Sequence, residues 1–399
     1  MNTIATRWYS LLILLCCHPM YLTAGGLSVE GIGTRPLAMG GAFTAVADSP
    51  EAVYYNPAGL TQIPGTVLNA SVIYLRVINS YKPVIGRTER SWEEVAAPSA
   101  FASWEVAALN GLNPIHIGFG IYSPFARVAD YGEGTRGGLQ DAYGKAVRKD
   151  ISLTASYQLN EKLSFGGGLI AANGVTEQTV QPGFGVPVTV TDDIDGWGYG
   201  GILSLMYQPQ KNLRLGIVYR SKIDIDQEGT RKISIAPVAY DIESEIKFPA
   251  TVGLGIAYMP TDKLTLSAGA DWTDWSRLDK VVTKSDGLPD QTTTVGSENT
   301  LELRLGAEYQ LSPDMVLRAG FLHSPSSTPS EWILPQRPDY EHFYALTIGA
   351  GRSWKNMELN LLYEYAWSSK DEVTDNSYGF NGDYYIELQS IGISFNYSF

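Results

Sequence analysis

The chain has 399 residues, a formal net charge of −13 and 44% hydrophobic residues. This acidity does not indicate nucleic acid as a partner. The sequence also lacks a run of about 18 apolar residues, which argues against membrane-spanning helices. The counts of glycine (41), tyrosine (24) and tryptophan (9) are generous. Such counts are typical of a chain with many strands, tight turns and interfacial aromatic residues.

Residues 1–24 have the features of a secretory signal peptide. Arg7 supplies the positive charge, and the apolar core from Leu11 to Cys17 is too short to span a bilayer. Cleavage at the end of this segment would remove Cys16 and Cys17, the two cysteines of the chain. The mature chain is therefore expected to have neither disulfides nor thiolate metal sites.

Residues 25–64 do not alternate between apolar and polar side chains. Small residues dominate Ala38–Ala47, which permits a compact, closely packed helical segment. Asp48 or Ser49 can cap a helix that follows. The simplest interpretation of this region is a small helical lid, or hatch, against one end of a barrel.

From about residue 65 to residue 399 the chain is a series of alternating segments, as expected for strands with one apolar face. The clearest is Leu301–Tyr309, in which the odd positions are apolar. We count roughly 14 such segments, an even number, as in single-chain bacterial barrels. The last one, Ile391–Phe399, ends on an aromatic residue. This ending is similar to the signal that outer-membrane barrels present to their assembly machinery.

The connections between these segments alternate in length. The short ones are 110–113, 159–161, 209–211, 260–262, 312–313 and 355–356. The longer and more polar ones are 80–95, 123–144, 176–195, 227–239, 281–297, 324–340 and 369–383. Short turns at one end and long loops at the other are the arrangement of transmembrane barrels. The sequence thus predicts an all-β fold, a transmembrane antiparallel barrel of about 14 strands over residues 65–399.

An aromatic residue precedes most of the short turns. In each case it lies on the face of its strand that carries the apolar side chains. These residues are Tyr157, Tyr207, Tyr258, Tyr309 and Trp354, with Tyr397 near the carboxyl end. One outward aromatic residue per hairpin, at the same height, predicts a ring at a membrane–water interface. In a soluble sandwich these rings would form the core, but the opposite parity is too rich in charge for a soluble core.

Several segments resemble the FadL/TodX (OMPP1) family of outer-membrane transporters for hydrophobic compounds. In the hatch they are Gly31-x-Gly33, Met39–Asp48 and Asn56–Leu60, and in the barrel Gly118–Phe125 and Tyr157–Gly168. The resemblance implies a barrel plugged from the periplasmic side by the hatch. It also implies apolar binding sites in the barrel for long-chain fatty acids or aromatic hydrocarbons. These substrates would leave sideways, through a gap made by a kink in the third strand.

The resemblance further assigns roles to individual residues. It places the hatch motif Asn56, Pro57 and Ala58 near the gap. We also expect Asn56 to cap the turn that Pro57 begins. The kink, and with it the candidate lateral opening, is expected at three residues: Ser123, Pro124 and Phe125. The alternative is that Pro124 lies above the membrane and simply starts a loop. The long third and fourth loops that collect substrate in fatty-acid transporters look short here, which puts an outer capture site in doubt.

Some charged residues occupy the alternate strand positions whose side chains should point into the barrel. They include Arg214, Arg304 and Arg318. The simplest interpretation is that they form salt bridges across the lumen and to charged residues of the hatch, namely Glu30, Arg35, Asp48 or Glu51. The alternative is that one arginine holds a substrate carboxylate, since a guanidinium matches a carboxylate in two-point geometry.

The sequence predicts no enzyme, metal site or cofactor. His116, His323 and His342 fall on separate predicted strands or loop edges without zinc spacing, and G-x-S-x-G does not occur. Gly166–Ala171 matches a loose dinucleotide fingerprint, but it lies within an alternating strand with no helix after it. Its glycines more simply allow a side chain or the hatch to approach the wall.

The sequence therefore predicts an outer-membrane channel for passive uptake of hydrophobic small molecules. Its other partners would be outer-membrane lipid, lipopolysaccharide and the barrel assembly machinery. The alternative is a component of a protein secretion or assembly system built on the same barrel. A water-filled porin is also conceivable, but the hatch should block it.

Overall fold

The computed structural model describes residues 28–106, 113–132, 142–180, 188–236 and 238–399. The predicted signal peptide at 1–24, with both cysteines, lies outside the described residues. So does most of the predicted short connection at 110–113.

Within the described residues, nineteen strand segments form one antiparallel sheet that closes on itself. The closure is the pairing of the first segment with the last, from Val67 opposite Ser398 to Pro83 opposite Gly382. The segments are β1 (Thr66–Pro83), β2 (Glu89–Val106), β3 (Ile115–Asp130), β4 (Tyr143–Asn160), β5 (Leu163–Val180), β6 (Val190–Gln210), β7 (Leu213–Arg220), β8 (Ile223–Ile233), β9 (Ala239–Phe248), β10 (Thr251–Thr261), β11 (Leu264–Thr273), β12 (Lys280–Ser285), β13 (Gln291–Thr294), β14 (Thr300–Ser312), β15 (Met315–Pro325), β16 (His342–Trp354), β17 (Met357–Ser368), β18 (Asp371–Val373) and β19 (Gly382–Ser398).

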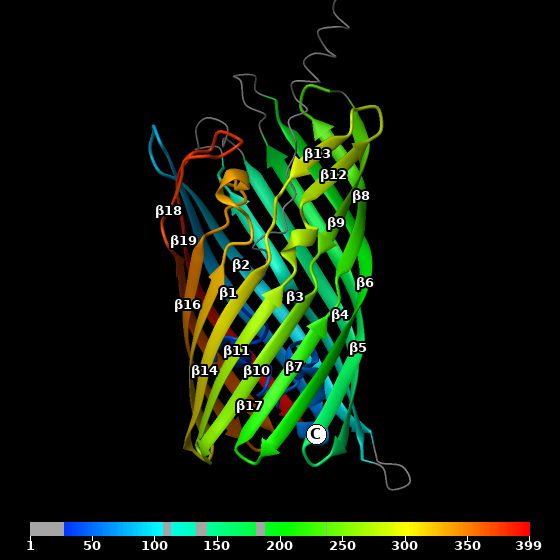
Figure 1. Cartoon of the computed structure of the whole chain (residues 1–399), viewed down its shortest axis with the longest axis vertical. Coiled ribbons are helices and arrows are strands. Elements are labelled where there is room, and N and C mark those ends of the chain that lie inside the picture. The colour runs from blue at the N-terminus through cyan, green and yellow to red at the C-terminus, as the bar shows by residue number, and fades with distance from the viewer. Residues whose placement is uncertain (1–27, 107–112, 133–141, 181–187, 237) are drawn as a thin grey trace, which may run out of the picture.

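Five pairs of consecutive segments are single wall strands with an interruption, so the barrel has 14 strands (Figure 1). For example, β6 pairs with β7 at Ile202–Arg220 and, further along, with β8 at Trp197–Asp226. The other divided strands are β9 with β10, β11 with β12, β13 with β14, and β17 with β18. The prediction of an all-β, 14-stranded transmembrane barrel is confirmed.

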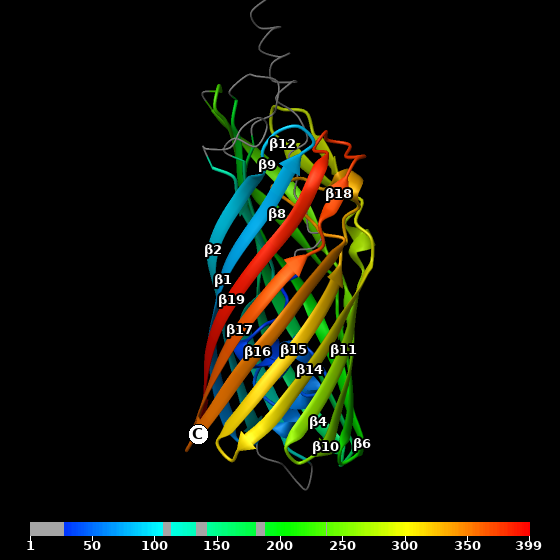
Figure 2. The ribbon, with the colours of Figure 1, turned by 90° about the vertical axis from the view of Figure 1, so that its left-hand side faces the viewer.

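Several predicted long loops are in fact largely strand. β5 continues to Val180 and β6 begins at Val190, so most of 176–195 is paired sheet. Likewise, β8 reaches Ile233 within the predicted connection 227–239. Beyond the hydrocarbon both faces of a strand can be polar, so the apolar alternation ends while the backbone ladder continues. Figure 2 shows the wall continuing well beyond the level of the hatch.

The outer face carries two rings of aromatic residues. The predicted ring near the short turns includes Tyr207, 40% exposed, and Tyr309, 44% exposed. A second ring lies nearer the other end of the barrel and was not predicted: Tyr74, Tyr199, Tyr219, Trp272 and Tyr365. Exposed leucines such as Leu303 and Leu305 lie between the two rings. Two aromatic girdles around an apolar band are the outer surface of a membrane barrel.

Residues 28–64 form the hatch, which lies inside the barrel at the end with the short turns and the carboxyl terminus (Figure 1). Its helices are short: α2 (Thr34–Leu37), α3 (Ala52–Tyr55) and η1 (Pro57–Gln62). Among the described residues, no helix is long and apolar enough to cross a membrane.

Two details of the hatch differ from expectation. Ala38–Ala47 is a series of turns rather than a helix, because Gly40 and Gly41 adopt φ of 62° and 73°, a left-handed conformation that reverses the chain. The predicted helix cap was also wrong. The N-cap residue of α3 is Glu51 rather than Asp48 or Ser49, and no side chain makes a capping hydrogen bond there.

Candidate functional site

The hatch motif is held by hydrogen bonds at its first residue. The Asn56 side chain accepts from the Ala58 N–H at 3.1 Å, as predicted for a cap of the turn that Pro57 begins. Its Nδ2 also donates to the Thr44 carbonyl oxygen at 2.8 Å and to the Leu205 carbonyl oxygen at 3.3 Å. Asn56 therefore joins two turns of the hatch to each other and to β6 of the wall.

The same motif packs against the wall without an intervening side chain. A Cβ atom on Gly166 of β5 would lie 2.5 Å from the Ala58 nitrogen and 2.6 Å from the Pro57 carbonyl carbon. The predicted role of these glycines, close approach of the hatch, is thus present at Gly166. The motif also contacts β5 and β6 through Ser164 and Ser204.

The three inward arginines already have partners in the structure. Arg214 donates to the Val46 carbonyl oxygen at 3.0 Å. Arg304 pairs with Asp271 at 3.0 Å and also with Glu302. Arg318 pairs with Glu308 at 2.6 Å.

The hatch shares in this network, since its Arg35 contacts Glu308 at 3.2 Å and Asp48 at 3.0 Å. Arg304 and Arg318 therefore form ion pairs, whereas Arg214 is bonded to a neutral group of the hatch, and none of the three arginines lines the cavity described below.

β3 breaks its ladder where the sequence places the kink. Its pairing with β4 runs to Tyr122–Asp150 and resumes at Phe125–Arg148, so Ser123 and Pro124 stand opposite a single residue. This is a β-bulge, and one extra residue reverses which side chains face inward. Phe125 consequently points into the lumen, with its ring 5.2 Å from that of Phe248. The loop alternative for Pro124 is wrong, because β3 continues to Asp130.

A gap in the wall adjoins this bulge. β2 and β3 pair from Val106–Ile115 to Ala100–Ile121, and the pairing stops there although both strands are described further. They meet again where the Asp130 N–H donates to Ser91 Oγ at 2.9 Å. We call the intervening stretch, residues 92–99 of β2 and 122–129 of β3, the wall gap.

The beginning of the hatch covers the inner side of the bulge. The Val29 N–H donates to the Pro124 carbonyl oxygen at 3.2 Å, and Ser28 forms an antiparallel bridge with Phe125. Further into the barrel, the Tyr54 ring of α3 lies edge-on to the Tyr122 ring, with centroids 5.1 Å apart. These hatch residues contact the kinked strand at or next to the bulge.

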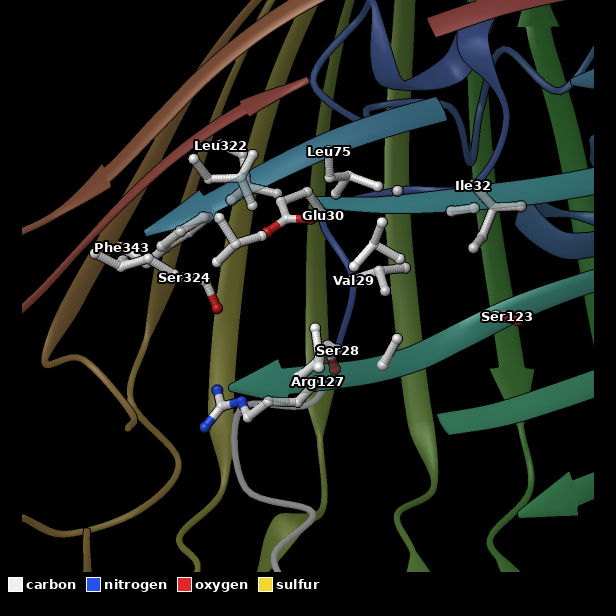
Figure 3. Close-up of a pocket in the computed structure, with 18 of the residues that line it drawn as sticks. Ser28, Val29, Glu30, Ile32, Leu75, Ser123, Arg127, Leu322, Ser324 and Phe343 are labelled. Atoms are coloured by element: carbon white, nitrogen blue, oxygen red, sulfur yellow. The ribbon is translucent and has the colours of Figure 1, made fainter. Parts of the chain in front are cut away.

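A cavity of about 310 Å³ lies between the hatch and the wall gap. We call it the central cavity. Its lining is mainly apolar and includes both edges of the gap, among them Ala97 and Pro98 of β2 and Ser123 of β3. Figure 3 shows Glu30 beside Leu322 and Ser324, and Arg127 extending from β3. The remaining apolar lining includes Val29, Ile32, Leu75, Val95, Val147, Trp275, Phe343 and Leu388.

Sequence reasoning missed the charged residues of this cavity and Pro98. Arg127 and Glu30 both line it. Glu30 had been considered only as a salt-bridge partner, and burial raises its pKa. Because the bulge reverses the parity of β3, Arg127 would have counted as outward in a simple alternation. A proline within an alternating segment, such as Pro98, is a signal that could have marked an unpaired edge.

The structure also brings together two histidines that the sequence placed apart. His323 Nε2 and His342 Nδ1 lie 3.2 Å from each other on the paired strands β15 and β16. They adjoin Tyr344 and Trp367, so they belong to the aromatic surface of the barrel. Within the described residues, no group of three side chains is placed to hold a metal ion.

Comparison with known proteins agrees with this architecture. Residues 17–399 match the family described as outer membrane protein transport protein (OMPP1/FadL/TodX). The long-chain fatty acid transport protein of Escherichia coli O6:H1 is 22% identical over 414 residues, covering 89% of this chain and 90% of the relative. Outer membrane protein P1 of Haemophilus influenzae is 23% identical over 418 residues, with the same coverage.

Solved structures share the fold. A Pseudomonas aeruginosa FadL homologue superposes with a TM-score of 0.81 at 17% identity, covering 94% of this chain and all of that one. The P. putida toluene transporter TodX gives a TM-score of 0.74 at 19% identity, covering 93% of this chain and 99% of that one. This chain is a β-barrel of the bacterial outer membrane and belongs to the outer membrane protein transport protein (OMPP1/FadL/TodX) family.

Proposed function

We propose that this protein takes up hydrophobic small molecules, such as long-chain fatty acids or aromatic hydrocarbons. They would bind in the central cavity and pass through the wall gap. The observation that carries the proposal is that the two unpaired edges of the gap, at Ala97–Ser99 and Ser123, are themselves part of the cavity lining. A molecule in the cavity therefore lies next to an interruption in the wall.

The height of the gap supports a route into the membrane. The gap begins just beyond Ala100, which pairs with Ala70 of β1, and Ala96 within it pairs with the ring residue Tyr74. The lower part of the gap is thus at the level of the apolar band. Unpaired backbone groups in hydrocarbon cost several kcal/mol unless protein covers them or they line a cavity. Here the hatch and the cavity meet that condition at Pro124.

The secretion alternative has less support. The hatch fills the barrel end near the short turns, with buried residues throughout Thr34–Ala47, and the cavity of about 310 Å³ suits a small molecule. The outward face suggests two further partners. Lipid and lipopolysaccharide would surround the band between the aromatic rings, and Phe399, 73% exposed, stays a predicted signal for the assembly machinery.

The test is to fill the gap from the inside. Ala97→Trp places a large ring on the cavity side of β2, whereas Ala96→Trp places the same ring on the exposed outer face of the same strand. We expect Ala97→Trp to lower uptake of radiolabelled toluene and oleate at equal surface abundance, with Ala96→Trp like the wild type. Normal uptake through folded Ala97→Trp barrels would contradict the proposed route.

A further inference from the structure

The connection between β15 and β16 folds into the lumen of the barrel. Residues 333–340 within it are all buried, although the connection belongs to the end of the barrel with the long loops. We call residues 326–341 the roof loop. Four of its residues line the central cavity: Ser327, Pro338, Asp339 and Tyr340. The hatch lines the opposite side of the cavity, so the roof loop lies between the cavity and the end with the long loops.

The two ends of the roof loop are tied to each other. The Ser326 N–H donates to the Glu341 carbonyl oxygen at 3.3 Å. The Asp339 carboxylate accepts the N–H groups of Ser327 at 3.0 Å and Thr328 at 3.1 Å. A surface loop whose ends meet and whose residues pack on one another can move as a unit.

The tip of the roof loop is a tight turn. The Arg337 N–H donates to the Leu334 carbonyl oxygen at 2.8 Å, and the two residues form a small antiparallel bridge. Pro335 and Pro338 fix φ at two positions of this turn. These features are internal to the roof loop, so the tip keeps its shape without contact with the wall.

Carbonyl oxygens of the tip are bound by donors on β3. The Tyr131 hydroxyl donates to the Pro335 carbonyl oxygen at 2.9 Å, and the Arg127 guanidinium donates to the Pro338 carbonyl oxygen. Arg127 lies within the wall gap and Tyr131 directly follows it. Hydrogen bonds of these kinds contribute only modest net free energy. The tip can therefore be released while the barrel stays folded.

The wall itself does not depend on the position of the tip. β15 and β16 pair as far as Pro325 and His342, and the roof loop connects these two residues. A movement of the tip away from β3 consequently breaks none of the ladder bonds between β15 and β16.

We propose that the roof loop is the gate through which hydrophobic molecules enter the central cavity, and that Arg127 and Tyr131 are its latch. The gate opens when the tip leaves β3, and it closes when the two donors bind the tip again. This inference rests on the proposed function, because it takes the central cavity to be the substrate site. It adds a controlled entrance on the side with the long loops to the exit through the wall gap.

A cysteine pair can lock the proposed gate. Cleavage of the signal peptide would leave no native cysteine, so engineered cysteines pair only with each other. A Cβ atom on Gly144 of β4 would lie 3.3 Å from the Gln336 carbonyl oxygen at the tip. Gly144→Cys with Gln336→Cys therefore ties the tip to the wall. Closure is checked by loss of thiol labelling, and a short bis-methanethiosulfonate reagent bridges the pair if a direct disulfide does not form.

The control pair is Thr179→Cys with Thr191→Cys. These residues are opposite each other on β5 and β6, with their hydroxyl oxygens 3.2 Å apart, so their disulfide leaves the roof loop free. Uptake of radiolabelled toluene and oleate is measured in cells at equal surface abundance, before and after reduction. We expect uptake through the locked gate to be at least tenfold lower than through the same barrel after reduction. The control pair should show no change on reduction.

A second measurement follows the latch without a cross-link. Tyr131→Phe removes the hydroxyl that binds Pro335, so the amides of residues 333–340 should exchange roughly threefold to tenfold faster than in the wild type. Tyr143→Phe is the matched control, because the Tyr143 hydroxyl donates to Glu177 instead. Equal exchange in the two variants would overturn the role of Tyr131 as a latch.

The outcomes separate this inference from the proposed function. Uptake through the closed Gly144–Gln336 cross-link at the level of the reduced barrel would overturn the gate and leave the uptake of hydrophobic molecules standing. A block by the control cross-link that matches the block by the tip cross-link would also overturn it. If the reduced and wild-type barrels take up neither toluene nor oleate, the proposed function fails, and the gate fails with it.

Discussion

The backbone N–H of Val29 donates to the carbonyl oxygen of Pro124 at 3.2 Å, so the hatch is tied to the wall at the residue where the ladder of β3 is interrupted. A break in a membrane wall exposes backbone groups that lipid cannot satisfy. The first residues of the hatch satisfy one of them. The hatch and the wall gap are therefore one structural unit.

Replacing Val29 by proline tests this link, because proline has no N–H to donate. The loss of one hydrogen bond to a buried carbonyl costs about 1–3 kcal/mol locally, too little to unfold the barrel. We expect faster amide hydrogen exchange at residues 30–34 in Val29→Pro. Val29→Ala keeps the N–H and should show exchange close to the wild type. Equal exchange in the two variants would mean that the Pro124 contact does not hold the segment.

Asn56→Ala should lower uptake of a hydrophobic substrate while the barrel stays folded. The substitution removes the cap and both donor contacts, to Thr44 and Leu205, and loss of a cap costs on the order of 1 kcal/mol. Asn160→Ala is a matched control, because Asn160 accepts the Lys162 N–H in an exposed wall turn at 2.9 Å. Radiolabelled uptake per folded barrel is the measurement. Uptake of Asn56→Ala at the level of Asn160→Ala would reduce Asn56 to a dispensable cap.

Arginine substitutions should report depth in the membrane. Leu305 is 55% exposed between the two aromatic rings, so Leu305→Arg should cost about 2–4 kcal/mol of folding free energy. Tyr207→Arg and Tyr309→Arg, in the ring near the short turns, should cost roughly 0–1 kcal/mol each. Folding titrations in lipid vesicles measure these differences. Similar losses of folding free energy at the three sites would refute the placement of Tyr207 and Tyr309 at the membrane interface and of Leu305 in the apolar band.

The sequence was sufficient to predict features that repeat along the chain and features that depend on one residue with special backbone chemistry. Alternation indicated the 14 strands, and one aromatic residue per hairpin indicated the ring that includes Tyr207. The side-chain chemistry of Asn56 indicated the cap, and Pro124 indicated the break. Each of these signals is local, because it depends on a strand period or on the residue itself.

The wall gap and the central cavity could not be predicted in this way. Residues 92–99 keep their pairing with β1, so the strand retains its alternation and only its other edge is unpaired. The cavity is lined by residues from distant parts of the chain, such as Val29, Leu75 and Phe343. A sequence also does not show which charged side chains meet. The length of the predicted loop at 176–195 was overestimated. Strands beyond the membrane can be polar on both faces, so they no longer alternate between apolar and polar residues.

The last prediction concerns how the hatch is seated. Gly320 of β15 lies against the hatch backbone, and a Cβ atom there would be 1.9 Å from the Gly40 nitrogen and 2.3 Å from the Met39 carbonyl carbon. Backbone atoms cannot move aside as the end of a side chain can, so Gly320→Ala should displace the hatch from the wall. The barrel ladder at Gly320 remains intact, because alanine suits a strand at least as well as glycine.

We therefore expect Gly320→Ala barrels to insert and show the normal heat-dependent gel shift. Their ion conductance in planar bilayers should rise, and cells carrying them should become more sensitive to vancomycin. Gly167→Ala is the control, because Gly167 lies on the outer parity of β5 and the nearest atom to its added Cβ would be the flexible Leu203 Cδ2 at 3.0 Å. If Gly320→Ala conducts no more than Gly167→Ala, close packing at Gly320 is not what keeps the lumen closed.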